Sequence, residues 1–292
     1  MTAARDPALP HISWGRNRYL EVDGERVHVV ERGTIGERLL LVHGYASHSL
    51  AWRPVMDRLD GRFQMAAVDM PGFGWSARVA TRPLTGEAYG ERLARILAAL
   101  GWPRAHVAGI SWGGGLAQRL AAAHPDMVDR LALVATIDPS RPLWLGSVGL
   151  RLAIRFPRLA RIVVARALRA AARKGGVPAG ELARGYVDPL LLPGTAAFLS
   201  RFVAEHAGSE LLDLSRIVAP TLVIGPLEDQ VVDPAVTRSV AERISGARYE
   251  AIPGARHSVA FESPDRVASL IAEFLRSVAL ADEASLAPRL PA

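Results

Sequence analysis

The sequence predicts an α/β protein with a mostly parallel central sheet, helices on both faces of that sheet, and a helical segment inserted late in the chain. Short apolar runs alternate with amphipathic helical patterns, which is typical of βαβ units. The alternation stops after residue 137 and resumes at residue 220. With 292 residues, of which 50% are hydrophobic, the chain is long enough for one large domain with a buried core.

The first predicted element is a β-hairpin over residues 18–31. Its two strands flank Asp23-Gly24, a pair that readily adopts the positive φ angles of a tight two-residue turn. The apolar runs that follow are near-continuous in Val, Leu, Ile and Ala, as strands buried on both faces should be. These runs predict strands at 38–43, 63–69, 105–110, 130–136, 220–225 and 247–252. The helical patterns between them cover 50–59, 87–100, 113–124, 233–245 and 263–279.

The chain is therefore predicted to form a sheet-bearing core from residues 1–137 and 220–292, with a helical cap, or lid, at 138–219 after the sixth strand. The cap carries the whole formal net charge of +6, because it holds 11 Arg and 1 Lys against 6 acidic residues. We expect Pro157 to divide its most basic helical pattern in two. One stripe of that pattern carries Arg151, Arg155, Arg158, Arg166, Arg169 and Arg173.

Two interpretations of this basic stripe stay open. The arginines can form a solvated face above an apolar face that packs on the core. Alternatively, they can make weak contact with an anionic membrane surface or an acidic carrier-bound substrate. Nucleic acid is not an expected partner, because the stripe has little aromatic interleaving. The sequence does not indicate an oligomeric state.

Composition excludes some chemistry. The chain has no cysteine, so disulfides and thiolate metal sites are excluded, and no His, Asp and Glu cluster has metal-ligand spacing. We therefore expect neither a metal nor a cofactor. No apolar run is long enough for a transmembrane span, and the N-terminus lacks the apolar region of a secretory signal. We expect a cytoplasmic protein, and the strong preference for arginine over lysine suggests a bacterial one.

The strongest functional signal is the pattern G-x-S-x-G at Gly109–Gly113, centred on Ser111. A predicted buried strand ends at Ile110, and a predicted helix rich in small residues follows directly. A sharp turn between strand and helix exposes the serine hydroxyl at the edge of the sheet, where a nucleophile is needed. The alternative is a glycine-rich turn that only caps a helix.

A serine needs a base, and the base needs an orienting acid. Asp229 and His257 each follow a predicted strand, and parallel sheets gather their sites at that edge. Asp138 and Glu228 are alternative acids. Two backbone amides should stabilise an oxyanion: that of Trp112, next to the serine, and that of Tyr45, in the loop after the strand at 38–43.

Five motifs carry a resemblance to a known family. In chain order they are VHGYASHS, DMPGFGWS, GISWGG, PTLVIGPLEDQVVDP and PGARHSVAFESP. Over residues 17–280 the chain resembles the α/β-hydrolase superfamily, in the branch with a helical cap after strand 6. The run GISWGGGLAQ also resembles the corresponding turn of intracellular polyhydroxyalkanoate depolymerases.

The resemblance implies a serine hydrolase that cleaves an ester, thioester or lactone of a hydrophobic small molecule through a Ser-His-Asp triad. It also leaves open a carbon–carbon bond-cleaving, lyase-like or tailoring enzyme in which His257 and Asp229 act as general base. A non-catalytic ligand receptor on the same fold is a third possibility. The expected pocket residues are Gly44 and, from the cap, Trp144, Phe156 and Leu190.

The chain departs from the family pattern at two places. Gly225-Pro226 stands where many relatives have Trp-Gly, and Arg256 stands where they have a glycine before the histidine. We expect Arg256 to face solvent, although contact with a substrate carboxylate is the alternative. We expect Asp69 to hold the turn that follows it.

Three further histidines are not expected to act in catalysis. His43 should be a hydrogen-bonded structural residue. His48 and His206 should lie on the surface or in the cap.

Overall fold

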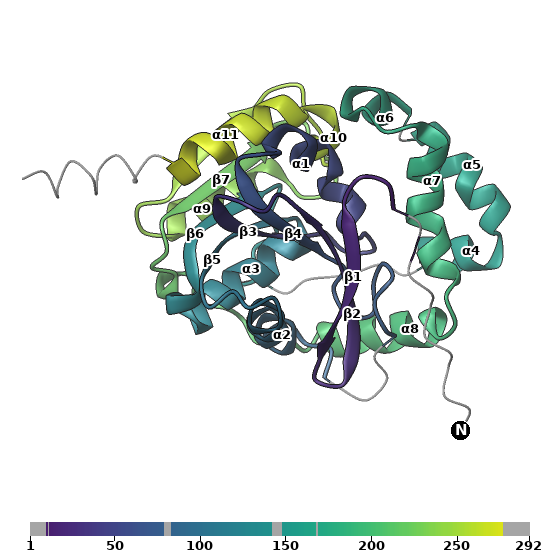
Figure 1. Cartoon of the computed structure of the whole chain (residues 1–292), viewed down its shortest axis with the longest axis horizontal. Coiled ribbons are helices and arrows are strands. Elements are labelled where there is room, and N and C mark those ends of the chain that lie inside the picture. Colours follow the sequence, from purple (N-terminus) through teal and green to yellow (C-terminus); the bar gives the residue numbers. More distant parts are fainter. Residues whose placement is uncertain (1–9, 11, 79–82, 142–147, 168, 277–292) are drawn as a thin grey trace, which may run out of the picture.

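The structure is a computed structural model that describes residues 10, 12–78, 83–141, 148–167 and 169–276. Eight strands form one sheet in the order β1-β2-β4-β3-β5-β6-β7-β8 (Figure 1). The strands are β1 (Arg16–Val22), β2 (Glu25–Arg32), β3 (Glu37–Val42), β4 (Phe63–Val68), β5 (Ala105–Ile110), β6 (Val128–Val134), β7 (Thr221–Pro226) and β8 (Arg248–Ile252). The pairs β1–β2 and β2–β4 are antiparallel, and all later neighbours are parallel. The predicted, mostly parallel sheet is confirmed.

The predicted hairpin is also confirmed. Asp23 and Gly24 connect β1 to β2 with φ angles of 56° and 75°. Positive φ at both central residues is the backbone of a tight turn that matches the twist of the two strands.

Helices cover both faces of the sheet. In chain order before the sixth strand they are η1 (Ser49–Trp52), α1 (Arg53–Leu59), α2 (Gly86–Ala99), α3 (Trp112–Ala123) and η2 (Pro125–Met127). After the seventh strand they are α9 (Pro234–Arg243), α10 (Val259–Glu262) and α11 (Pro264–Arg276). Residues of α2, α3 and α9 belong to one core cluster, and residues of α1 and α11 belong to the other. Alternate residues from Leu39 to Val42 in β3 point to opposite clusters, which is why these four positions are all apolar.

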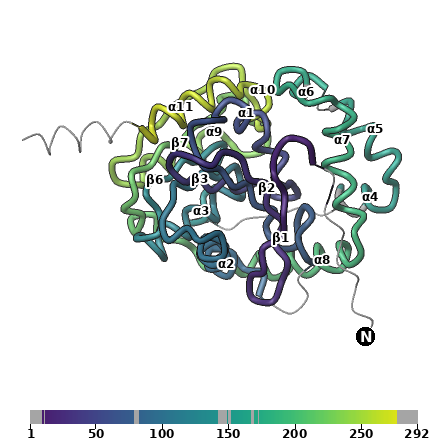
Figure 2. Tube along the Cα trace, viewed as in Figure 1, coloured from purple at the N-terminus to yellow at the C-terminus, as the bar shows by residue number. Residues whose placement is uncertain are grey.

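Between β6 and β7 the described residues form helices and no strand, as predicted. We call residues 138–219 the insertion. Its helices are α4 (Val148–Arg155), α5 (Pro157–Ala167), α6 (Arg169–Gly175), α7 (Ala179–Val187), η3 (Asp188–Leu191), α8 (Thr195–His206) and η4 (Leu214–Arg216). The expected break at Pro157 is confirmed, because α4 ends at Arg155 and Pro157 begins α5. The Cα trace in Figure 2 shows α4 to α7 together at one side of the molecule.

The interpretation in which the apolar face of the basic helices packs on the core holds only in part. Ile154 of α4 packs against the core, but most large apolar side chains of α4 and α5 do not. Leu152, Phe156, Leu159, Ile162 and Val163 are 50–59% exposed. Helix α5 packs against α7 instead of the central sheet, so these side chains have no core to cover them. The helical period of the sequence identifies an apolar face, but it does not say what that face contacts.

Candidate active site

Ser111 lies in a sharp turn between β5 and α3. Its backbone has φ 54° and ψ −120°, a conformation that L-residues other than glycine rarely adopt. Hydrogen bonds hold this strained turn: the Ser111 amide donates to the Val134 carbonyl at 2.9 Å, and the Ser111 carbonyl accepts from Gly114 at 3.0 Å. The turn therefore presents the serine hydroxyl at the carboxyl edge of the sheet, as the G-x-S-x-G pattern predicts.

The two flanking glycines are needed because the backbone passes close to its neighbours. A Cβ atom on Gly109 would lie 2.4 Å from the Gly113 carbonyl oxygen. A Cβ atom on Gly113 would lie 2.2 Å from the His43 carbonyl oxygen. Neither contact can relax by moving a flexible side chain, so any larger residue would displace the turn or the neighbouring loop.

The structure brings Ser111, His257 and Asp229 into one hydrogen-bonded chain. His257 Nδ1 lies 2.7 Å from Asp229 Oδ2, and His257 Nε2 lies 3.2 Å from Ser111 Oγ. The carboxylate of Asp229 accepts at Oδ1 from the backbone amides of Val231 and Val232, at 2.8 and 3.0 Å. An acceptor at Nδ1 favours the tautomer that donates to Asp229 and leaves Nε2 free to accept the serine proton.

The alternative acids are placed elsewhere. Asp138 Oδ1 accepts from the amide and hydroxyl of Ser140, and Asp138 Oδ2 lies 3.0 Å from an Arg243 nitrogen. Glu228 is exposed, beside Asp229 in the loop after β7. Of the three candidate carboxylates, Asp229 is the one that contacts His257.

The loop after β3 packs against the serine. A Cβ atom on Gly44 would lie 3.3 Å from Ser111 Cβ, so only glycine allows this approach without displacement. His43 holds the loop: its Nδ1–H donates to the Gly44 carbonyl at 2.7 Å, and its Nε2 accepts from the Met70 amide at 2.9 Å. His43 is thus the hydrogen-bonded structural residue that the sequence predicts.

Two amides are suited to an oxyanion at this site. Trp112 begins α3, and the first amides of a helix have no acceptor within the helix. Tyr45 follows Gly44 in the loop that packs on Ser111, and its ring lines the cavity beside the serine. Burial raises the pKa of the Tyr45 phenol to about 12, so this side chain stays neutral.

A cavity of about 210 Å³ opens beside Ser111 and His257. Its walls are mainly apolar or aromatic, with the two hydroxyls of Ser47 and Ser258. The larger lining side chains are Tyr45, Ile110, Tyr186, His257 and Phe261. Tyr186, on α7, is the contribution of the insertion to this cavity among the described residues.

The expected pocket residues have different outcomes. Gly44 lines the cavity, but Phe156 and Leu190 do not. Phe156 lies on the exposed face of the insertion, and Leu190 borders a separate small void beside Phe73 and Thr195. Trp144 lies outside the described residues.

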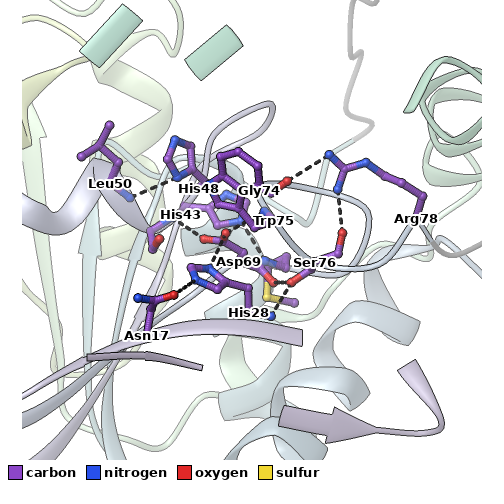
Figure 3. A network of polar contacts seen from close by, with 12 residues as sticks. Asn17, His28, His43, His48, Leu50, Asp69, Gly74, Trp75, Ser76 and Arg78 are labelled. Carbon is purple, nitrogen blue, oxygen red and sulfur yellow. Dashed lines mark hydrogen bonds and ion pairs between the residues drawn. The ribbon is translucent and has the colours of Figure 1, made fainter. Parts of the chain in front are cut away.

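Beneath the β3 loop, a buried network surrounds Asp69 (Figure 3). Asp69 Oδ1 accepts from the Ser49 amide at 2.7 Å, and Oδ2 accepts from the Trp75 amide at 2.8 Å. His28 Nδ1 lies 2.9 Å from the same Oδ2 atom. Asp69 therefore ties the turn that follows it to the loop that carries Tyr45, which confirms its expected structural role.

His206 connects the insertion to the serine turn, a role that sequence reasoning missed. Its Nε2 accepts from Trp112 Nε1 at 2.9 Å, and its Nδ1 lies 2.9 Å from the Leu84 carbonyl oxygen. The imidazole stacks on Phe202 with ring centroids 4.7 Å apart. Burial lowers the pKa of His206, which favours the neutral ring that can accept from Trp112.

Replacing His206 with alanine is expected to lower the free energy of unfolding by about 2–3 kcal/mol, because the buried Trp112 N–H loses its acceptor and Phe202 loses its stacking partner. Urea denaturation at pH 7.5 measures the change. His124→Ala is the matched control, since that histidine is partly exposed and its ion pair with Glu91 is worth little. Equal losses in the two variants would contradict the structural role of His206.

The sequence makes predictions for two further side chains near the site, Arg256 and His48. Arg256 is exposed, and its guanidinium lies 3.4 Å from Glu262, in agreement with the expected solvent orientation. His48 is buried, contrary to the expected surface position.

Within the described residues, no group of three metal-binding side chains is found, and no helix is long and apolar enough to cross a bilayer.

The chain is similar in sequence to known hydrolases. A sequence model of the α/β hydrolase fold family matches residues 37–173. The chain is 29% identical over 265 residues to a protein of Caulobacter sp. (strain K31) assigned as the carbamate hydrolase RutD, covering 87% of this chain and 96% of the relative. It is 29% identical over 263 residues to the 2-hydroxymuconate semialdehyde hydrolase of Pseudomonas sp. (strain CF600), covering 86% and 91%.

Solved structures show the same fold. The meta-cleavage product hydrolase CumD of Pseudomonas fluorescens IP01 matches with a TM-score of 0.73 and 23% identity, covering 89% of this chain and 98% of that one. This likeness confirms the fold class that the sequence predicts, including the mostly parallel sheet flanked by helices.

Proposed function

Because this chain is an α/β hydrolase, we propose that it cleaves an ester, thioester or lactone of a hydrophobic small molecule. The observation that carries the proposal is the hydrogen-bonded chain from Asp229 through His257 to Ser111. In this proposal Ser111 is the nucleophile, His257 the general base and acid, and Asp229 the group that orients the imidazole.

The reaction has two halves. Ser111 Oγ attacks the substrate carbonyl while His257 Nε2 takes the hydroxyl proton, and the carbonyl oxygen becomes an oxyanion between the amides of Tyr45 and Trp112. The protonated His257 then gives its proton to the leaving oxygen or sulfur, and an acyl group remains on Ser111. Water loses a proton to His257 and attacks that acyl group. When the serine leaves with the proton, the acid product and the free enzyme are formed.

The cavity supports a small hydrophobic substrate. Its volume of about 210 Å³ lies below the range of about 300–1,000 Å³ that is usual for drug-sized ligands. An acyl chain can make apolar contact with Ile110, Phe261 and the ring of Tyr186. None of these three side chains carries a charge that would bind a charged substrate. A short acyl group therefore fits the cavity better than a long one.

A second candidate reaction is hydrolysis of a carbon–carbon bond. It is favoured by the 29% identity to the 2-hydroxymuconate semialdehyde hydrolase, which extends over 86% of this chain. In that reaction His257 and Asp229 would act as the base, and Ser111 would orient the substrate. The two candidates place the same three side chains at the reacting atoms, and they differ in whether an acyl group forms on Ser111.

A fluorophosphonate probe is expected to label the wild-type protein and to fail on Ser111→Ala, because only an activated serine attacks the probe. Intact-mass spectrometry measures the adduct. Ser47→Ala and Ser258→Ala are matched controls, since both hydroxyls line the same cavity, and both variants should label like the wild type. Absence of labelling in the wild type, or equal labelling of Ser111→Ala, would refute the proposal. A series of p-nitrophenyl esters then measures the preferred acyl length.

A further inference from the structure

The outer helices of the insertion combine positive charge with exposed apolar side chains. Residues 148–174 contain seven arginines and Lys174, with no Asp or Glu. Figure 1 shows α4 and α5 on the outer side of α7, and α5 packs on α7. We call the exposed face of α4 and α5 the α4–α5 surface. Its apolar members are Leu152, Phe156, Leu159, Ile162 and Val163.

The exposed apolar side chains of this surface, called the apolar cluster below, lie close together in the sequence. They account for five of the eleven large apolar side chains that are exposed in the described part of the chain, and they lie within twelve residues. Within α5, Ile162 and Val163 follow Leu159 by three and four residues, a spacing that places side chains on one face of a helix. Leu152 lies in α4, and Phe156 lies at the break between the two helices. An exposed group of apolar side chains of this kind indicates a surface that binds a protein or a membrane.

Cations flank the apolar cluster. Arg155 precedes Phe156, Arg158 precedes Leu159, and consecutive helical residues are about 100° apart around the axis. Arg161 lies 2.7 Å from Asp188, but the described residues place no carboxylate in ion-pair contact with Arg158 or Arg166. These unpaired guanidinium groups are therefore available to external anions at the border of an apolar face.

We propose that the α4–α5 surface binds at the headgroup level of an anionic lipid bilayer. The apolar side chains enter the boundary between headgroups and acyl chains, and the arginines on the neighbouring stripe bind lipid phosphates. A bilayer interface covers both kinds of group at once, because it presents anionic headgroups above an apolar layer.

Charge argues against other occupants of this surface. A symmetric dimer through the same face would oppose Arg155, Arg158 and Arg166 with the same three arginines of the second copy, and α4 and α5 carry no acid to offset them. Nucleic acid would neutralise the arginines but would leave the apolar cluster in water. The bilayer satisfies the charge and the apolar area together.

The position of the surface gives the binding a consequence for the site. Helix α5 packs on α7, and α7 carries Tyr186, which lines the cavity beside Ser111. A bound bilayer would thus lie one helix away from the wall of the cavity. Hydrophobic molecules concentrate in bilayers, so this placement brings the protein to its proposed class of substrate. The binding itself does not depend on the proposed reaction.

Vesicle flotation with the full-length protein tests the proposal. The vesicles contain phosphatidylcholine alone, or equal parts of phosphatidylcholine and phosphatidylglycerol. We expect the wild type to float with the anionic vesicles and not with the neutral ones, and added salt should weaken the binding. Replacing three arginines together (Arg155→Gln, Arg158→Gln and Arg166→Gln) should weaken binding on the order of 100-fold, from about fivefold per cation. The apolar triple Leu159→Ser, Ile162→Ser and Val163→Ser should weaken it by a similar factor.

Matched controls separate this surface from general stickiness and from catalysis. Ile35→Ser, Val218→Ser and Val231→Ser together remove three other exposed apolar side chains, and this variant should bind like the wild type. Ser111→Ala should also float like the wild type, because flotation measures membrane binding, which does not require the serine hydroxyl. Failure of the wild type to float, equal flotation with neutral vesicles, or normal flotation of the apolar triple would overturn the proposal. So would light scattering that shows a wild-type dimer, without flotation, that the apolar triple dissociates.

Discussion

His257→Ala is expected to lower kcat on the order of 10⁵-fold on the preferred ester. Among the described residues, His257 is the one group in hydrogen-bond contact with both Ser111 and Asp229, so its removal leaves the serine without a base and the leaving group without an acid. The side chain is 25% exposed, and the buried carboxylate of Asp229 keeps the Val231 and Val232 amides as donors when the imidazole is removed. Unfolding by urea should therefore change little, and the loss should fall on kcat.

The companion variant decides between the two candidate reactions. If an acyl group forms on Ser111, Ser111→Ala should lose about as much as His257→Ala, and the double variant should lose no more than either one, because the residues act as a unit. If His257 acts as a base on a carbon–carbon bond, Ser111→Ala should retain most activity on the true substrate while His257→Ala loses it. Single-turnover kinetics on each substrate class measure the difference. Arg256→Gln, next to His257 but exposed, is the control that should leave kcat nearly unchanged.

The parts of the site that the sequence predicts are those set by strand ends. Ser111, Asp229 and His257 each follow a strand of the parallel part of the sheet, and a parallel sheet places the ends of its strands at one edge whatever the loops between them do. Gly109 and Gly113 can be predicted for a related reason. Where a strand turns directly into a helix, the backbone passes so close to its neighbours at these two positions that a Cβ atom would not fit. These residues depend on local pattern and sheet order, which sequence periodicity records.

The parts that sequence reasoning missed depend on how helices of the insertion pack. Tyr186 lines the cavity because α7 faces it, but an aromatic residue in an amphipathic helix has no mark that distinguishes a pocket wall from ordinary packing. His206 is similar, because its partner Trp112 is 94 positions away. Phe156 has the opposite outcome: its pattern suits a pocket, yet its side chain is half exposed, and the Arg155 guanidinium lies over its ring, 5.1 Å from the ring centroid.

Asp69→Ala is expected to lower the free energy of unfolding by about 3–5 kcal/mol, the largest stability effect we anticipate for a single side chain outside the hydrophobic core. Asp69 is fully buried, and its carboxylate is the acceptor for the Ser49 and Trp75 amides and a partner of His28. Without it, these buried donors are left without an acceptor. Asp69→Asn should lose about half as much, since its amide oxygen can still accept one bond. Asp126→Ala, at an exposed position, should change stability by less than about 0.5 kcal/mol.

The pH dependence of this loss identifies the carboxylate as its cause. Burial alone would raise the pKa of Asp69, but the neighbouring His28, with His48 and His43, outweighs burial and holds that pKa well below its usual range. A carboxyl with a lowered folded pKa contributes stability above its unfolded pKa of about 4 and loses it as the pH falls further. The difference between wild type and Asp69→Asn should therefore be constant from about pH 5 to 7 and should shrink below about pH 4.

His43 acts in a separate window. Burial lowers the pKa of His43 to about 4, so the folded protein resists protonation at this ring. Its contribution is complete above the unfolded pKa of about 6.5 and is lost between about 6.5 and 4, because the unfolded chain binds the proton first. Urea denaturation from pH 7.5 to 3.5 should thus show the wild type losing stability first in the histidine window and then in the carboxylate window. Burial also lowers the pKa values of His48, His106 and His206, so these rings act in the same direction. A wild type equally stable at pH 7.5 and 4.5 would contradict the neutral state of the buried histidines, including His43 in the loop that carries Tyr45.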